Sequence, residues 1–251
     1  MSKLKVTWVS DLHLDFPINV SRVLNGDIDN VHNADVLVIA GDTCEHDKRQ
    51  SLKHVFEHLQ SQYSFIIEIP GNHNYWSMNY NNKKHKQMFE SFQQWEADNH
   101  VYVNNTTVYI DDIAFVCSCL WSKINYEEQV EIQHTMNDYA FIKNFVTMDS
   151  MCIHKRSAKF LQQELQKPGK KIVVSHHLPS YQLIDPCYVH ETTNSAYASS
   201  LEHMFDCDFE FWIHGHSHSR VDEMILDRRF VRNPLGYPGQ YLQCNTYVIQ
   251  V

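Results

Sequence analysis

Five short apolar runs in this chain are each followed at once by polar residues of the kinds that bind metal ions. The clearest run spans Ala34 to Ala40 (ADVLVIA) and is followed by Gly41-Asp42. An unbroken apolar run of this length is typical of a strand that is buried on both faces, as in a parallel sheet. Because the carboxyl ends of such strands open onto one crevice, the polar residues that follow them are expected to lie close together.

The other four runs end in aspartate, asparagine or histidine. They place Asp11 and His13 after residues 3–10, Asn72 and His73 after residues 65–69, His176 and His177 after residues 171–175, and His214, His216 and His218 after residues 209–213. Residues two apart in an extended segment project to the same side, so Asp11 and His13 can reach one ion together. The two carboxylate oxygens of Asp42 can bridge two ions. Nitrogen and oxygen ligands without a thiolate suit ions such as manganese, iron, zinc or nickel.

Between these runs the sequence predicts helices and a later β-rich part. The predicted helices are Leu52 to Leu59, Lys83 to Asn99 with Met88, Phe89, Phe92 and Trp95 turned inward, a helix from Asp149, as its cap, to about Lys167, and a short one at residues 200–205. Asp111-Asp112 is predicted to turn a hairpin, whereas residues 125–144 are ambiguous. Alternating helices and strands, followed by strands, favour an α/β fold of two packed sheets with helices outside.

Length and composition limit the remaining possibilities. The 251 residues contain no repeat or low-complexity linker, so one domain over residues 1–251 is expected. No signal peptide or membrane-spanning run is recognised, which favours a cytoplasmic protein without membrane contact. The seven cysteines are scattered and form no CxxC pair, which argues against a disulfide framework. A formal net charge of −9 disfavours attraction to nucleic acid.

Taken in chain order, the motifs DxH, GD, GNH, HH and GHxH resemble those of the calcineurin-like metallophosphoesterase superfamily. The resemblance extends from Asp11 to about Gly236. Other stretches are similar to one branch of prokaryotic and phage-type members, and they are CLW at 119–121, MNDY at 136–139, AYAS at 196–199, WIH at 212–214 and NPLGY at 233–237.

This resemblance implies a fold, a metal centre and a reaction. The implied fold is a pair of mixed sheets sandwiched between helices. The implied ligands are Asp11, His13 and His218 for one divalent ion, Asn72, His176 and His216 for the other, and Asp42 as a bridge between both. His73 matches the histidine that contacts the scissile phosphate or protonates the leaving group. Two ions roughly 3.5–4 Å apart would clamp the phosphate and activate a bridging hydroxide, which attacks phosphorus in line.

The sequence departs from the family pattern at two places. The family commonly has an acidic residue after GNH that orients and charges the histidine, but Asn74 stands here. His73 is therefore expected to be less basic and less firmly held, and His177 is either a substitute or a packing residue. Protein phosphatases of the superfamily extend GD with an arginine-bearing motif, which residues 41–46 lack. A protein-phosphatase role is disfavoured.

We expect a hydrolase that acts, as a phosphatase or phosphodiesterase, on a phosphorylated small molecule or a nucleotide. A metal-dependent nuclease and a non-catalytic metal-binding interaction module are the alternatives. A nuclease would need a basic track beside the metals, which the sequence does not show. Arg220 and Arg232 can serve as phosphate contacts or as surface charges. Aromatic residues in the loops can either stack a nucleobase or pack the loops, and they are Trp76, Tyr80, Trp121, Tyr126, Tyr181 and Tyr197.

Overall fold

The computed structural model describes residues 3–240 and 249–251, which form two six-stranded sheets flanked by helices. The strand order is β12-β1-β2-β3-β5-β4 in the first sheet and β10-β11-β9-β8-β7-β6 in the second. The inner strands of each sheet run parallel, and the strands at both edges pair antiparallel. Both sheets are therefore mixed, as the sequence predicts.

The elements have the following bounds. The first sheet contains β1 (Lys5–Val9), β2 (Val36–Ala40), β3 (Phe65–Ile69), β4 (Phe92–Ala97), β5 (His100–Asn104) and β12 (Ile249–Gln250). The second contains β6 (Thr106–Ile110), β7 (Ile113–Ser118), β8 (Lys170–Ser175), β9 (Phe211–Ile213), β10 (Val221–Ile225) and β11 (Arg228–Arg232). The α-helices are α1 (Pro17–Leu24), α2 (Lys53–Gln60), α3 (Lys83–Glu90), α4 (Gln129–Thr135), α5 (Asn137–Phe141) and α6 (Thr147–Leu165).

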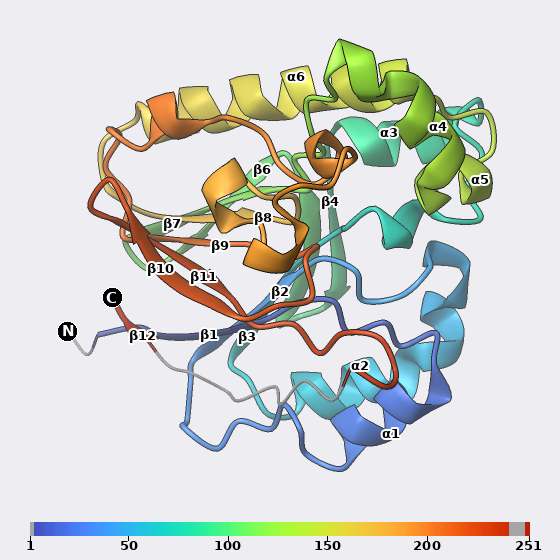
Figure 1. Cartoon of the computed structure of the whole chain (residues 1–251). Helices are drawn as coiled ribbons and strands as arrows, with labels where there is room; N and C mark the ends of the chain where they lie inside the picture. The colour runs from blue at the N-terminus through green and yellow to red at the C-terminus, as the bar shows by residue number, and fades with distance from the viewer. Residues whose placement is uncertain (1–2, 241–248) are drawn as a thin grey trace.

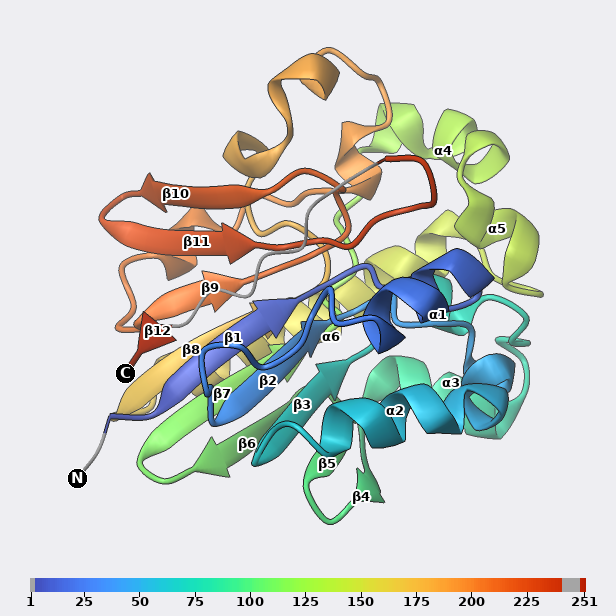
Figure 2. The same ribbon diagram turned by 90° about the horizontal axis from the view of Figure 1, so that it is seen from below.

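Strand β2 shows how the layers are built, because every one of its residues is buried. Val36 and Val38 belong to the core between the two sheets, whereas Leu37 and Ile39 pack on the other face against α1 and α2. The second sheet packs its outer face against α6 in the same way. Figure 1 shows α6 on one side and α1 and α2 on the opposite side, with both sheets between them. The parallel strands point toward one end of the molecule in Figure 2.

One predicted helix is wrong in its second half. Helix α3 ends at Glu90, and residues 92–97 form β4 instead, which pairs antiparallel with β5 at the edge of the first sheet. The segment FQQWEA fits an edge strand because Phe92 contacts Tyr102 while Trp95 remains 54% exposed. The apolar spacing that imitates a helix comes from two elements joined at Ser91, whose backbone is extended.

The other predicted elements are found with small shifts. Asp149 lies in the first turn of α6 instead of before it, and its Oδ2 accepts a hydrogen bond from the Val146 backbone N–H at 3.1 Å. The ambiguous residues 125–144 hold α4 and α5, whereas the predicted helix at 200–205 is a single 3-10 turn. Within the described ranges, no helix is both long and apolar enough to span a bilayer. The predicted absence of disulfides holds for six cysteines, and Cys244 lies outside the described residues.

Candidate metal centre

The predicted site residues lie where the carboxyl ends of the two sheets meet. The chain that leaves β1 runs beside the chain that leaves β11, because Ser10 donates its backbone N–H to Asn233 O at 3.0 Å and accepts from Leu235 N at 2.9 Å. Asn233 Nδ2 also donates to Trp8 O at 3.0 Å. These bonds hold the first and last sequence motifs together although about 200 residues separate them along the chain.

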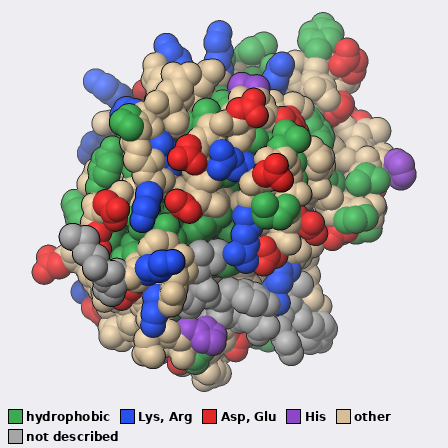
Figure 3. All heavy atoms as spheres, turned by 90° about the vertical axis from the view of Figure 1, so that its left-hand side faces the viewer, with side chains coloured by type: hydrophobic (Ala, Val, Ile, Leu, Met, Phe, Trp, Pro, Cys, Tyr) green, Lys and Arg blue, Asp and Glu red, His purple; other side chains and the backbone are tan. Residues whose placement is uncertain are grey.

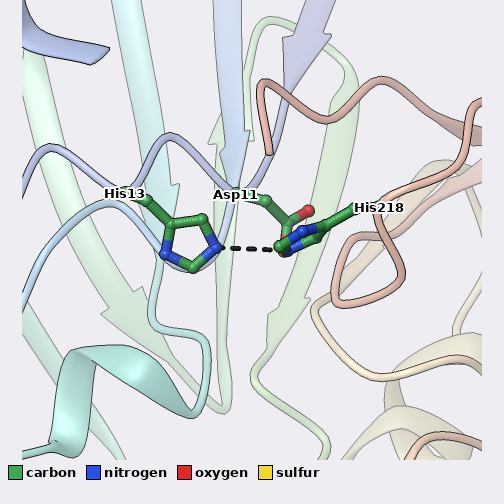
Figure 4. Close-up of side chains that lie close together, drawn as sticks. All are labelled: Asp11, His13 and His218. Atoms are coloured by element: carbon green, nitrogen blue, oxygen red, sulfur yellow. Dashed lines mark hydrogen bonds and ion pairs between the residues drawn. The ribbon is translucent and has the colours of Figure 1, made fainter. Parts of the chain in front are cut away.

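Asp11, His13 and His218 form one group whose potential ligand atoms all lie within 4.8 Å of one another. His13 Nε2 and His218 Nε2 are 3.1 Å apart, and His218 Nε2 is 3.5 Å from Asp11 Oδ1 (Figure 4). Two nitrogen ligands about 2.0–2.1 Å from one ion stand about 3–3.5 Å apart. The spacing in this group therefore fits a single bound ion.

Asp42, His176 and His216 form the second group within the same limit. Asn72 belongs beside them, because its Oδ1 is 3.0 Å from His176 Nε2. Asp42 Oδ2 lies 3.4 Å from His176 Nε2 and 4.0 Å from His13 Nε2. One carboxylate oxygen thus stands between the two groups, which is the position that the bridging role requires.

The backbone at this edge is held in an unfavourable conformation. Asp11, His13, Asp42 and His216 all have positive φ angles, of 54°, 44°, 54° and 70°. This left-handed region disfavours residues with a Cβ, and such strain is concentrated at functional sites. The surrounding structure enforces the conformation so that the four side chains converge.

Gly71 allows the segment before Asn72 to approach Asp42 closely. A Cβ at this position would lie 2.1 Å from Asp42 Oδ1 and 2.6 Å from His176 Cε1. Neither atom belongs to a side chain that can move aside, because both residues are buried. The glycine of the GNH motif is therefore a packing requirement of the two groups.

The electrostatics of the groups suit cations. Burial raises the pKa of Asp42, but the imidazoles of His176 and His13 outweigh it and hold the pKa well below its usual range. Burial lowers the pKa of His176, yet Asp42 and Asp11 bring it to about 9. His216 keeps a lowered pKa because burial dominates, and its Nε2 is buried without a hydrogen-bond partner among the described residues. Such an unpartnered nitrogen fits a metal ligand.

His73 is more basic and more firmly held than the sequence predicts. Its Nε2 is 2.8 Å from Asp15 Oδ2, and its ring packs on Trp76 with centroids 4.0 Å apart. Burial lowers its pKa, but the bond to Asp15 and the charge of Asp42 reverse the effect, so the pKa is raised. The prediction was wrong because the acidic partner comes from the first motif, two residues after His13, and not from the position after GNH.

Asn74 has a separate task. Its Oδ1 accepts the backbone N–H groups of Asp42 and Gly71 at 2.9 and 2.8 Å, and its Nδ2 donates to Cys44 O at 2.8 Å. The side chain therefore ties the GD and GNH segments together. Cys44 itself is fully buried, and burial raises the pKa of its thiol, so the thiol is unreactive.

His177 and Arg232 are packing residues. His177 is buried with a pKa lowered by burial to about 3, and its ring stacks on Trp121. Arg232 is neither a surface charge nor a phosphate contact, because it is only 1% exposed and donates to Ser219 and to Leu183 O. Arg220 is exposed and donates to Asn233 Oδ1 at 3.3 Å.

A cavity of about 550 Å³ opens beside the two groups. Asp42, Asn72, His216 and His218 form one part of its wall. Four aromatic residues also line it, and they are Trp76, Tyr188, Tyr197 and Tyr237. Of the six loop aromatics in the sequence, Trp76 and Tyr197 line the cavity, Tyr80 and Trp121 lie in a hydrophobic core, Tyr181 packs beside another, and Tyr126 is 84% exposed.

Sequence reasoning missed Asp15 and Asp138 as neighbours of the site. Asp138 is buried, lines the cavity and accepts a hydrogen bond from Asn72 Nδ2 at 2.8 Å. Asp138 stands inside the MNDY segment, and Asp15 lies two residues after the DxH motif. Their motif context was a signal, but which ligand each one contacts depends on the fold.

Comparisons with known proteins agree with this geometry. The family model of the calcineurin-like phosphoesterases matches residues 4–220. An uncharacterized protein of Acanthamoeba polyphaga mimivirus is 28% identical over 267 residues, covering 96% of this chain and 94% of that protein.

Two solved structures share the fold at low identity. Phosphopantetheinyl hydrolase (PptH) from Mycobacterium tuberculosis has a TM-score of 0.72 at 17% identity, over 100% of this chain and 96% of that one. GAP50 of Plasmodium, described as the anchor in the inner membrane complex, has a TM-score of 0.51 at 15% identity, over 94% and 72% of the two chains. The two-sheet α/β architecture is thus one that both of these solved structures also have.

Proposed function

The chain belongs to the calcineurin-like phosphoesterase family, whose members are hydrolases of phosphoester bonds, and we propose that it cleaves a phosphomonoester or phosphodiester with two divalent metal ions. One ion would be held by Asp11, His13 and His218, the other by Asn72, His176 and His216, with Asp42 between them. The position of Asp42 Oδ2, 3.4 Å from His176 Nε2 and 4.0 Å from His13 Nε2, carries this proposal.

The kinds of ligand atom in the two groups support the proposal that the groups bind metal ions and do not only stabilise the fold. These kinds are imidazole nitrogens, carboxylate oxygens and one amide oxygen, a mixture that suits manganese, iron, zinc or nickel. His216 Nε2 is buried without a partner among the described residues. When bound, two such ions neutralise charge on the phosphate and lower the pKa of a water molecule between them.

His73 would act on the departing oxygen. Asp15 holds its Nε2 and raises its pKa against the effect of burial, so the imidazolium form is favoured. Its Nδ1 is buried without a partner among the described residues, so it is the ring nitrogen that Asp15 does not engage. Trp76 packs on the ring and fixes its plane. A proton on Nδ1 can then be given to the leaving group, a contribution of about 10²–10⁴-fold.

The cavity supports a small molecule or a nucleotide as substrate. Its volume of about 550 Å³ is typical of small-ligand sites, and its aromatic wall can contact an uncharged organic group. Among the described residues, no lysine or arginine lines it. On the face that carries the chain termini, basic and acidic side chains are interspersed (Figure 3). A nuclease needs a basic track beside the metals for the phosphate backbone, and the described residues that line the cavity offer none, so this alternative is disfavoured.

We also infer that residues 1–251 form one domain. The last strand, β12, pairs antiparallel with β1, so that Lys5 lies opposite Gln250. The two ends of the chain thereby contribute to one sheet. A cytoplasmic location stays a prediction from the sequence.

Metal removal and add-back tests the proposed function. The protein is treated with a chelator, and Mn²⁺, Fe²⁺, Zn²⁺, Ni²⁺ or Mg²⁺ is returned separately. Hydrolysis of p-nitrophenyl phosphate and bis-p-nitrophenyl phosphate is then followed for the wild type and Asp42→Asn. We expect metal-dependent turnover that the substitution abolishes, and the better compound separates monoesterase from diesterase. A wild-type protein that binds no metal would refute the proposal.

A further inference from the structure

We propose that Asp138 is a positioning residue that turns the oxygen of the Asn72 amide, and not its nitrogen, toward the second group of candidate ligands. This inference rests on the proposed function, because it concerns how the second ion obtains one of its ligands. Asp138 stands in the MNDY segment, to which the proposed reaction gives no role. It belongs to neither group of candidate ligands, and in this proposal it acts through Asn72.

The two ends of the Asn72 amide have different neighbours. Nδ2 donates to Asp138 Oδ1 at 2.8 Å, and Oδ1 lies 3.0 Å from His176 Nε2. Asn72 is 6% exposed and Asp138 4% exposed, so water does not compete freely for either end. The amide oxygen is therefore directed into the group formed by Asp42, His176 and His216.

An asparagine side chain needs such a neighbour in order to serve as a metal ligand. Its two ends are nearly equal in size, but only the oxygen can bind a cation, whereas the NH₂ group is a donor of two hydrogen bonds. Asp138 Oδ1 accepts a second bond, from Trp76 Nε1, at 2.8 Å. A flipped Asn72 would place its oxygen against this acceptor and lose a hydrogen bond in a buried site. Both bonds end on Oδ1, so they persist whether or not Oδ2 carries a proton.

Asp138 is held in place independently of Asn72. The segment that follows His73 is joined to the segment around α5 by backbone hydrogen bonds, from Ser77 N to Phe141 O at 3.1 Å and from Lys143 N to Met78 O at 2.9 Å. These bonds keep α5 at a fixed distance from the GNH motif. Asp138 can therefore impose an orientation on Asn72 instead of following it.

Binding of Mn²⁺ alone to chelator-treated protein tests the inference without any substrate. Free Mn²⁺ is measured by electron paramagnetic resonance during a titration. We expect two sites in the wild type, and one of them weakened about 10–100-fold in Asp138→Leu, which removes the acceptor but keeps a branched side chain. Tyr139→Phe is the matched control, because it removes a neighbouring bond of α5, from Tyr139 Oη to Ser150 Oγ at 2.9 Å, without touching Asn72. This control should retain both sites.

A second set of variants separates orientation from folding. In Asp138→Asn, the Trp76 indole N–H can still hold the new amide with its oxygen toward both donors, because indole nitrogen is a donor only. We expect Asp138→Asn and Trp76→Phe each to bind the second Mn²⁺ more tightly than Asp138→Leu. The double variant Asp138→Asn/Trp76→Phe should bind the second Mn²⁺ more weakly than the two single effects together would predict. In this variant, no neighbour is left that selects the orientation of the Asn72 amide.

The outcomes distinguish this inference from the proposed function. A wild-type protein with fewer than two Mn²⁺ sites would overturn the proposed function, and the positioning role with it. Two unchanged sites in Asp138→Leu would overturn the positioning role alone. Equal weakening in Asp138→Leu and Tyr139→Phe would also overturn it, because the effect would then come from a disturbed α5.

Discussion

Two buried clusters of charged side chains in this molecule are built in opposite ways. One is the candidate metal centre, and the other consists of Arg49, Glu68 and His100, which we call the arginine cluster. Arg49 donates to both carboxylate oxygens of Glu68 at 2.6 and 2.9 Å, and His100 Nε2 is 3.0 Å from Glu68 Oε2. His100 Nδ1 is 3.1 Å from Gln60 Nε2. Each charged or polar group of the arginine cluster therefore has a partner within the protein.

In the candidate metal centre, by contrast, not every polar group has a partner within the protein. His13 Nε2 and His218 Nε2 face each other at 3.1 Å, and His216 Nε2 has no partner among the described residues. Positive φ angles occur at four of its proposed ligands and at none of the three residues of the arginine cluster. A buried cluster that satisfies itself serves the fold, whereas a strained one that lacks partners indicates a place for a ligand.

The largest effect that this contrast predicts is on activity. Asp42→Asn removes the one carboxylate between the two groups of ligands while keeping the side-chain volume. We expect the metal-dependent hydrolysis rate to fall further than the about 10²–10³-fold that loss of one stabilising donor costs, because both ions lose a ligand. Initial rates at saturating Mn²⁺ are the measurement. Near-normal rates in Asp42→Asn would show that Asp42 is not a ligand of the metal centre.

The arginine cluster should respond to substitution through stability instead. Arg49→Met leaves the buried charge of Glu68 without its guanidinium partner and with only His100 bonded to it, and we expect the free energy of unfolding to fall by about 3–5 kcal/mol. Urea denaturation of the metal-free protein measures it. The control is Arg229→Met, because Arg229 pairs with Asp222 at 2.8 Å on the surface, where such a pair contributes less than about 1 kcal/mol. Equal effects of the two substitutions would contradict a structural role for the arginine cluster.

From the sequence, the proposed metal ligands could be expected to lie close together, because they follow the strands of the sheets directly. The sheet determines the position of a residue that directly follows a buried strand. Once the strands are recognised, the positions of Asp42 after β2 and of His176 after β8 therefore follow. The fold class follows from the same runs. The exact backbone conformation at Asp11 or His216, with positive φ, carries no sequence signal.

The partners of those ligands could not be predicted, since they depend on contacts between elements. Asp138 reaches Asn72 from a helix 66 residues away, in a segment whose periodicity is ambiguous. Arg49 and Glu68 stand 19 residues apart, and nothing in their spacing predicts a buried pair. The same reason explains the wrong prediction for residues 92–97. Their local apolar spacing favours a helix, but pairing with β5, which the local sequence does not reveal, makes them a strand.

A histidine outside both clusters is expected to have a smaller effect, on the pH dependence of stability. His154 is buried, and burial lowers its pKa to about 4. Between pH 6.5 and 4 the unfolded chain binds a proton that the folded protein does not, so stability falls as the pH falls. We expect a loss of about 2–3 kcal/mol from this group. Urea denaturation of the metal-free protein at pH 7 and pH 4.5 should show a smaller decrease in His154→Gln than in the wild type. An identical decrease would mean that His154 takes up its proton without unfolding.

The smallest expected effect tests whether Asp15 controls the charge of His73 or only its position. Asp15→Asn removes the charge bonded to His73 Nε2, so the pKa of His73 should fall and its protonated form should be lost at lower pH. We expect kcat at pH 7 to fall about tenfold, as one unit of pKa implies. The alkaline limb of the pH–kcat profile should move to lower pH. Asp27→Asn is the control, because it removes a carboxylate that pairs with Arg22 at 2.8 Å and leaves the bond between Asp15 and His73 intact. If Asp15→Asn lowered kcat without moving that limb, Asp15 would support the position of His73 and not its charge.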